Sequence, residues 1–347
     1  AERKSATSWI GHTDHRVHAL AVVPGSRLLI SGGSDRVARM WTPSPQSAQW
    51  RIASDGQNAM GIAMGQNNQL YVADRQILCW NLSSRKSSPL FSTHQEQFRS
   101  LATSRNCCGL AASDDRTLML FDTELQQLVC SWDIPAELGD PRLAVSPDGR
   151  KVATAWWDTS NHVEVYDADR PQQVLRLPAT QSNCALFSPD GQRLAYGTMN
   201  DLKIVDLEKI GDVEQDEPGL QLSGHSSTLS DCAFHPSGDY IATVSHDRRL
   251  KLWNAHSGEE LFSVIAHRDK IKTVAFSPDG DRLVTAGNDS IVKIWDRQSG
   301  QPLFDFGTES TGIRIVMFTP DGERLVCLLA DGTIVVYDIS TPASADS

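Results

Sequence analysis

Three histidines are each followed, at nearly constant spacing, by a hydroxyl residue, an aspartate and a tryptophan. The three sets are His12, Ser31, Asp35 and Trp41; His225, Thr243, Asp247 and Trp253; and His267, Thr285, Asp289 and Trp295. Serine, histidine and aspartate are the residues of nucleophilic catalysis, in which a base activates a hydroxyl group. A catalytic triad occurs once in an enzyme, however, and this combination occurs three times. The repetition therefore favours a structural role for these residues and predicts no catalytic site.

The elements that carry these residues are clearest in residues 267–296. Residues 271–276 and 283–286 form apolar runs, and residues 291–295 alternate between apolar and polar side chains. This pattern is typical of short, partly buried strands. Ser277-Pro278-Asp279-Gly280 has the composition of a turn, because proline fixes φ and Asp-Gly tolerates a reversal. The stretch therefore predicts three strands joined by two turns.

This unit recurs along the chain. Its third strand ends in an aromatic or apolar residue followed by a polar one at Trp41-Thr42, Trp80-Asn81, Phe121-Asp122, Tyr166-Asp167, Val205-Asp206, Trp253-Asn254, Trp295-Asp296 and Tyr337-Asp338. The successive spacings are 39, 41, 45, 39, 48, 42 and 42 residues. The first turn recurs at residues 146–149, 188–191, 235–238 and 319–322. Periods of this length are typical of repeat architectures such as propellers.

Taken together, the phased copies resemble the WD40-repeat family of β-propellers over roughly residues 5–340. Gly11-His12 and Gly224-His225 supply the Gly-His pair of that family, and Ala266-His267 is a variant of it. The resemblance implies an all-β fold, a single closed propeller over residues 5–340. The composition of the two ends predicts loose termini at 1–4 and 341–347. It also implies that tryptophan, hydroxyl, histidine and aspartate are joined by hydrogen bonds within a blade.

Counting the repeats predicts eight four-stranded blades, with seven, the commoner number in the family, as the alternative. The predicted repeats cover residues 11–54, 55–92, 94–133, 139–177, 181–207, 224–265, 266–306 and 312–338. The last repeat has no fourth strand of its own, whereas residues 5–10 directly precede the first Gly-His pair. We therefore expect the strand at 5–10 to complete the last blade and cover its open edge.

Bulk properties exclude several classes of protein. The net charge of −11 argues against nucleic-acid binding through overall basicity. No run of 18 apolar residues is present, so no membrane-spanning segment is predicted. The seven cysteines contain no Cys-x-x-Cys pair, which predicts reduced thiols in a cytoplasmic protein. There is no zinc, phosphate-loop or dinucleotide motif, so no metal or cofactor is expected.

In the family that this chain resembles, partners often dock on the narrower face, around the central channel. The contacts come from residues that flank the start of each inner strand and from the residue before the aspartate of the next turn. Carried over, the candidate partner-binding residues are Arg16, His18, Met60, Arg99, Asp114, Asn183, Ser230, His246, Lys270, Lys272, Asn288 and Arg314.

Five of these twelve residues are arginine or lysine, and one is acidic. Because guanidinium and ammonium groups bind carboxylates and phosphates, we hypothesise that an acidic or phosphorylated segment binds there. The alternative is that the cations only solvate the ends of loops, because exposed ion pairs contribute little individually.

The sequence thus predicts a non-catalytic protein-interaction scaffold. The alternative is a propeller enzyme, similar to a hydrolase or lactonase, with a pocket in the central channel. Because the chain begins at Ala1 without a signal-like stretch, we expect a fragment or a processed form, and a docking domain of a larger chain is compatible with the first prediction.

Overall fold

The fold is described from a computed structural model. The described residues are 61–73, 76–92, 98–104, 108–114, 116–135, 141–156, 161–208, 219–308 and 312–339, together with the backbone of the strands at 17–22, 29–33, 38–41 and 50–52. All regular elements among these residues are β-strands. No helix in the described part of the chain is long and apolar enough to cross a membrane.

Seven four-stranded sheets form the blades of a ring. The first blade contains β5 (Gly61–Met64), β6 (Gln69–Ala73), β7 (Gln76–Asn81) and β8 (Lys86–Ser92). The second contains β9 (Ser100–Thr103), β10 (Gly109–Ser113), β11 (Thr117–Asp122) and β12 (Gln127–Asp133). The third contains β13 (Arg142–Val145), β14 (Lys151–Ala155), β15 (His162–Asp167) and β16 (Val174–Pro178). The fourth blade contains β17 (Ala185–Phe187), β18 (Arg193–Thr198), β19 (Asp201–Asp206) and β20 (Leu220–Leu222). The fifth contains β21 (Leu229–Phe234), β22 (Tyr240–Ser245), β23 (Arg249–Asn254) and β24 (Glu260–Ile265).

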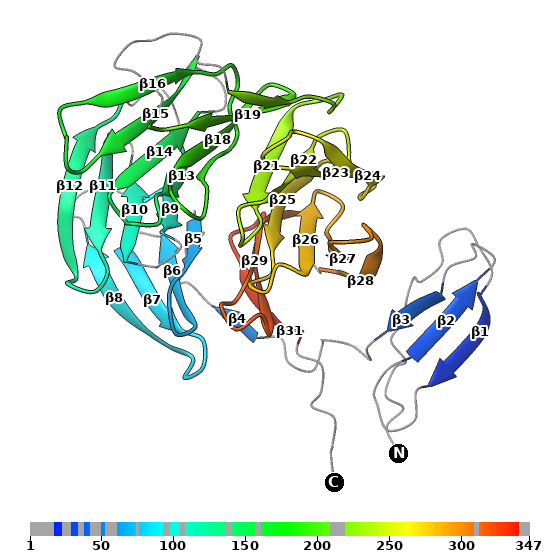
Figure 1. The fold of residues 1–347 in the computed structure, drawn as a ribbon. Coiled ribbons are helices and arrows are strands. Elements are labelled where there is room, and N and C mark those ends of the chain that lie inside the picture. Colours follow the sequence, from blue (N-terminus) through cyan, green and yellow to red (C-terminus); the bar gives the residue numbers. More distant parts are fainter. Residues whose placement is uncertain are drawn as a thin grey trace.

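The sixth blade contains β25 (Ile271–Phe276), β26 (Arg282–Gly287), β27 (Ile291–Asp296) and β28 (Pro302–Gly307). The seventh contains β29 (Ile313–Phe318), β30 (Arg324–Leu329), β31 (Ile334–Asp338) and, as its outer strand, β4 (Trp50–Ile52). All pairs within a blade are antiparallel, as in the pair of β30 with β31. Figure 1 shows the blades arranged around a common axis.

The hydrophobic core lies between neighbouring blades. Between the sixth and seventh blades, for example, Val284 and Ile294 pack with Leu325 and Cys327. The seventh blade packs against the first in the same way, since Val326 belongs to the same buried cluster as residues of β5 and β6. Each fully buried aliphatic side chain stabilises the fold by about 1.5–3 kcal/mol. These contacts close the ring of seven blades.

The prediction of eight blades is wrong, and the alternative of seven is correct. The strands β1 (Val17–Val22), β2 (Leu29–Gly33) and β3 (Ala38–Trp41) form a separate three-stranded sheet outside the ring, on the side of β28 (Figure 1). The strand β4, which follows them in sequence, pairs with β31 instead, with Ile52 opposite Ile334. The edge that residues 5–10 were expected to cover is therefore occupied by β4. Residues 5–10 lie outside the described residues.

The turn predicted at Ser277-Pro278-Asp279-Gly280 joins the first and second strands of the sixth blade. The Gly280 amide donates to the Ser277 carbonyl at 2.9 Å, and the Arg282 amide donates to the Ser277 hydroxyl oxygen at 3.0 Å. Gly280 has a φ of 80°, in the left-handed region that favours glycine. The turn thus lies at one end of the ring axis, and the inner strand β25 begins at the opposite end.

Candidate interaction surface

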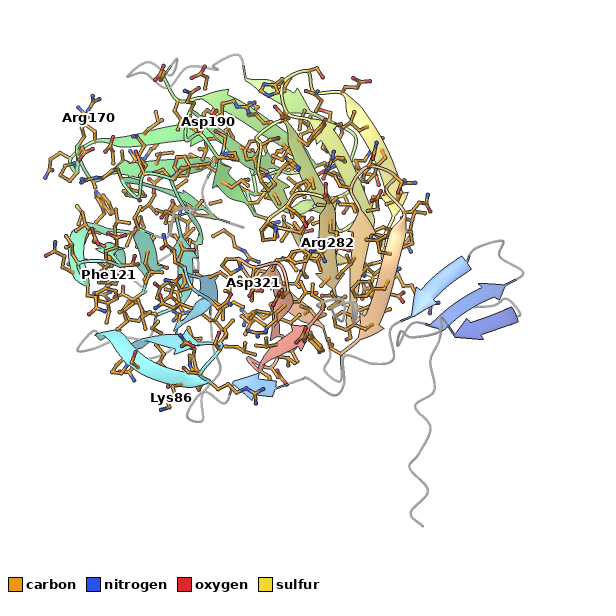
Figure 2. The ribbon with its side chains drawn as sticks, turned by 60° about the horizontal axis from the view of Figure 1, so that its bottom comes forward. Lys86, Phe121, Arg170, Asp190, Arg282 and Asp321 are labelled. Atoms are coloured by element: carbon orange, nitrogen blue, oxygen red, sulfur yellow. The ribbon has the colours of Figure 1, made fainter. Side chains whose placement is uncertain are left out.

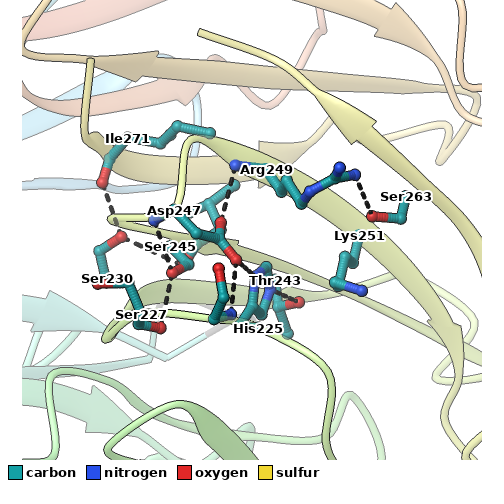
Figure 3. A network of polar contacts seen from close by, with 12 residues as sticks. His225, Ser227, Ser230, Thr243, Ser245, Asp247, Arg249, Lys251, Ser263 and Ile271 are labelled. Atoms are coloured by element: carbon teal, nitrogen blue, oxygen red, sulfur yellow. Dashed lines mark hydrogen bonds and ion pairs between the residues drawn. The ribbon is translucent and has the colours of Figure 1, made fainter. Parts of the chain in front are cut away.

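The fifth and sixth blades each contain one complete set of the histidine, threonine, aspartate and tryptophan residues. In the fifth blade, His225 Nδ1 lies 2.8 Å from Asp247 Oδ2, and His225 Nε2 lies 2.8 Å from Thr243 Oγ1 (Figure 3). The Trp253 indole donates to Thr243 Oγ1 at 2.9 Å. The sixth blade repeats this network, with Trp295 Nε1 2.8 Å from the threonine oxygen.

One histidine tautomer satisfies every member of such a network. With the proton on Nδ1, His267 donates to the Asp289 carboxylate and accepts from the Thr285 hydroxyl on Nε2, while that hydroxyl accepts from the Trp295 indole. Burial alone would raise the pKa of Asp289, but hydrogen bonds from His267 and from backbone amides hold it below its usual value. In the fifth blade, the same balance lowers the pKa of Asp247 to about 2.

The threonines of these networks are inaccessible to a substrate, because Thr243 is 1% exposed and Thr285 is 0% exposed. A nucleophile must reach its substrate, so the networks can hold the blades together but cannot attack a bound molecule from this position. The third predicted set, His12, Ser31, Asp35 and Trp41, lies outside the residues whose side chains are described.

Other blades keep single members of the network and lack their partners. Thr154 of the third blade occupies the register position of Thr285, yet its buried hydroxyl has no hydrogen-bond partner. Trp80 of the first blade occupies the position of Trp295, and Val72 stands where the threonine would be, so the Trp80 indole nitrogen is also unpaired. Complete networks therefore occur in two adjacent blades of the described ring.

The predicted partner-binding residues with described side chains lie at one end of the ring axis. In an antiparallel blade, the inner strand begins at the same end as the turn between the second and third strands. We call this end the mouth and define it by the residues Arg142, Met199, His246, Lys270, Lys272, Asn288 and Arg314. The side chains of Arg16, His18 and Met60 are outside the described residues.

Irregular pairing shapes the inner strands of the last three blades. The register shifts between Leu229 and Asp231, between Ile271 and Thr273, and between Ile313 and Ile315. The residue within each shift is Ser230, Lys272 or Arg314. A β-bulge of this kind inserts one residue and re-aims its side chain. All three bulged residues belong to the predicted set.

Several predicted partner-binding residues already contact the protein itself. The Ser230 hydroxyl donates to the Ile271 carbonyl of the next blade at 2.7 Å (Figure 3), and the Asn183 side chain donates to the Leu229 carbonyl at 2.8 Å. Asp114 accepts from two amides of its own turn. These side chains join blades or close turns, so they are less available to a partner than the exposed Lys270, Asn288 and Arg314.

Cationic side chains of the mouth lie close enough to one another to affect each other's pKa. Burial, and then the charges of Lys270 and Arg142, lower the pKa of Lys272, against the opposing charge of Asp269. Burial and the same two lysines lower the pKa of His246. Asp231 also lies near these cations: burial raises its pKa, and the charge of Arg142 opposes that shift. The cations of the third and sixth blades therefore act on one region of the axis.

Arg142 was missed because the third blade lacks the Gly-His pair, and its third strand does not have an aspartate six residues before Tyr166. A signal was nevertheless present. Counting back four residues from the first residue of each of the five Ser-Pro-Asp-Gly-type turns gives Arg142, Cys184, Asp231, Thr273 and Ile315. The count therefore places Arg142 level with Asp231 of β21 and Thr273 of β25. Within the described residues, no group of three histidine, cysteine, aspartate or glutamate side chains could hold a metal ion.

Comparison with known proteins gives matches to one family. Residues 3–42, 216–254 and 258–296 match the family model of the WD domain, G-beta repeat. The sheet β1–β3 thus falls within one matched repeat. The second match runs from β20, the outer strand of the fourth blade, through β23, and the third runs from β24, the outer strand of the fifth blade, through β27.

Individual curated proteins are also similar to this chain, and one of them is named for its WD repeats. WD repeat-containing protein SL1-17 of Schistosoma mansoni is 28% identical over 194 residues, which cover 53% of this chain and 60% of that protein. Protein tipD of Dictyostelium discoideum is 31% identical over 263 residues, 74% of this chain and 42% of that protein. Ribosome biogenesis protein erb1 of Pyrenophora tritici-repentis is 23% identical over 265 residues, 69% of this chain and 32% of that protein.

The chain therefore spans between about a third and three-fifths of the length of these relatives. The repeat matches, the repeat-containing relatives and the seven-bladed ring agree with one another. The chain belongs to the WD40-repeat proteins.

Proposed function

We propose that this chain is a non-catalytic protein-interaction module whose mouth binds an acidic segment of a partner protein, with carboxylate or phosphate groups as the recognised charges. WD40 domains generally mediate protein interactions, which supports the class of function. The choice of the mouth and of an acidic partner rests on the charges of this chain.

The observation that carries the proposal is the clustering of Arg142, Lys270 and Lys272. Their mutual repulsion contributes to the lowered pKa of Lys272, in a chain whose net charge is −11. Asp231 and Asp269 offset part of this charge. An incoming anion would relieve the repulsion, and opposite charge would also speed the encounter. Both effects favour an acidic partner over a neutral one.

The strength of the charge contribution follows from the exposure of the side chains. Exposed ion pairs contribute about 0.2–1 kcal/mol each. Reversing two lysine charges removes two such attractions and adds two repulsions, so a loss of about 1–4 kcal/mol is expected. That loss corresponds to a decrease in affinity of roughly 5- to 800-fold.

The test compares two double charge reversals in affinity capture from a lysate of the source organism. One variant carries Lys270→Glu and Lys272→Glu at the mouth. The control carries Lys86→Glu and Arg170→Glu, whose positions at the outer edge of the ring are visible in Figure 2. Both variants change the net charge equally. We expect a defined set of proteins to bind the wild type and the control but not the mouth variant. Equal capture by all three forms would contradict the proposal.

A further inference from the structure

Met199 is an exposed apolar residue at the mouth. Its exposed fraction is 49%, and it lies in the turn between β18 and β19 of the fourth blade. The turn of this blade is short, because Thr198 pairs with Asp201 across it. The corresponding turn of the sixth blade is longer, because the pair nearest to it is Ala286 with Val292. Counted along the second strand, Met199 has the position that Asn288 holds in the sixth blade, and Asn200 has that of Asp289.

The backbone of Met199 is in an unusual conformation for its residue type. Its φ of 53° lies in the left-handed region, where asparagine and glycine are favoured over long side chains. Single exposed apolar side chains are common on protein surfaces. Met199 differs from them because a polar residue would suit both its solvent exposure and its backbone better.

A succession of hydrogen bonds links the backbone at Met199 to the segments that carry the cations of the mouth. The Leu229 amide donates to the Met199 carbonyl at 2.8 Å, and the His246 amide donates to the Thr228 carbonyl at 2.9 Å. From the next residue, the Ser230 hydroxyl reaches the carbonyl of Ile271, which lies between Lys270 and Lys272. Met199, His246 and the two lysines therefore lie in succession on the fourth, fifth and sixth blades.

We infer that the partner segment carries an apolar side chain beside its acidic groups, and that Met199 contacts this apolar side chain while Lys270 and Lys272 contact the acidic ones. The inference rests on the proposed function of the mouth and specifies its ligand. Methionine suits such a contact because its flexible thioether adapts to differently shaped apolar groups. The combination selects a protein segment, because nucleic acid offers anionic groups without an aliphatic side chain beside them.

The test uses three pools of fluorescein-labelled ten-residue peptides and measures fluorescence anisotropy at low and high salt. The first pool is rich in aspartate, glutamate and phosphoserine and contains one leucine or phenylalanine. In the second pool, serine replaces that apolar residue. The third pool keeps the apolar residue and replaces every acidic residue by asparagine or glutamine. A single-stranded oligonucleotide serves as a competitor.

The variant Met199→Asn is the matched perturbation, because asparagine tolerates the left-handed backbone. Leu303→Asn removes an apolar side chain of the outer strand β28, which is 41% exposed, and serves as the control. We expect the wild type and the control to bind the first pool at least fivefold more tightly than the second. Met199→Asn should reduce this preference to less than twofold while leaving the salt dependence unchanged.

The outcomes separate this inference from the proposed function. Binding of both acidic pools with equal affinity, lost in the Lys270→Glu and Lys272→Glu variant, would overturn the role of Met199 alone. An unchanged preference in Met199→Asn would do the same. If no acidic pool binds, or if binding is unaffected by the lysine changes, both proposals fail. Displacement of the peptides by the oligonucleotide at equal concentration would also overturn the choice of a protein ligand.

Discussion

Replacing Thr285 by valine should destabilise the protein, whereas the same replacement of Thr154 should not. The two threonines have the same register position in their blades, and both are 0% exposed. Valine has nearly the shape of threonine, so the packing changes little in either case. The variants differ in hydrogen bonding, because Thr285 contacts His267 and Trp295, while the Thr154 hydroxyl is unpaired.

The magnitude follows from the number of groups left without a partner. Thr285→Val leaves the buried Trp295 indole N–H and His267 Nε2 unpaired, and each such group costs about 1–3 kcal/mol. The loss should therefore be about 2–6 kcal/mol. For a domain of this size, about 2 °C per kcal/mol converts this loss to a Tm decrease of about 4–12 °C. Thr154→Val removes a buried, unpaired hydroxyl, so its Tm should stay constant or rise by about 1–2 °C.

Thermal unfolding followed by circular dichroism measures both variants under identical conditions. The difference between the two Tm shifts is the informative quantity, because it removes the shared effect of introducing valine. A Trp295→Phe background provides a second control, since the effect of Thr285→Val should shrink when the indole donor is already absent. Equal destabilisation by Thr285→Val and Thr154→Val would refute the assignment of stability to the hydrogen-bonded network.

Three further predictions concern pH and ring closure. Burial, together with the charge of Arg297, lowers the pKa of His235, so this histidine binds a proton more readily in the unfolded chain than in the folded protein. The free energy of unfolding should therefore decrease as the pH falls below about 6.5. Urea unfolding between pH 7.5 and 5.5 should show a smaller decrease for His235→Ser than for the wild type. Burial would raise the pKa of Asp247, but hydrogen bonds outweigh this effect and hold the pKa at about 2. The stabilisation contributed by the Asp247 carboxylate should be present above about pH 4 and be lost as the pH falls to 2. The difference in unfolding free energy between the wild type and Asp247→Asn should shrink over that range. Cysteines at Arg51 and Val335, which face each other across β4 and β31, should form an intramolecular disulfide detectable by mass spectrometry under non-reducing conditions; its absence would contradict closure by β4.

The repeats could be predicted from the sequence because their signals are local. The turn at residues 277–280 and the spacing from His267 to Trp295 depend on residues that are near one another in the chain. Partners of the outer strands depend on distant segments. Trp50–Ile52 was assigned to the first repeat, although it pairs with a strand almost three hundred residues later. A short strand has too little sequence to specify which edge it will cover.

The composition of the mouth was predictable in part for the same reason. Lys270 and Lys272 follow from the regular sixth repeat, where neighbouring motifs fix their positions. Arg142 and Met199 lie in the third and fourth blades, which lack the Gly-His pair. The turn of the fourth blade is also shorter than that of the sixth. Alignment to the regular repeats alone could not reveal what replaces the missing residues.

Site-specific photo-crosslinking tests the central claim, that partners bind at the mouth, most directly. A benzophenone amino acid would replace Asn288, which is exposed beside Lys270, or Lys86 at the outer edge as the control. We predict that position 288 crosslinks to a partner and that mass spectrometry identifies the attached peptide as acidic, with an apolar residue next to the acidic groups. Crosslinks at position 86 without any at position 288, or a basic peptide at position 288, would contradict the account.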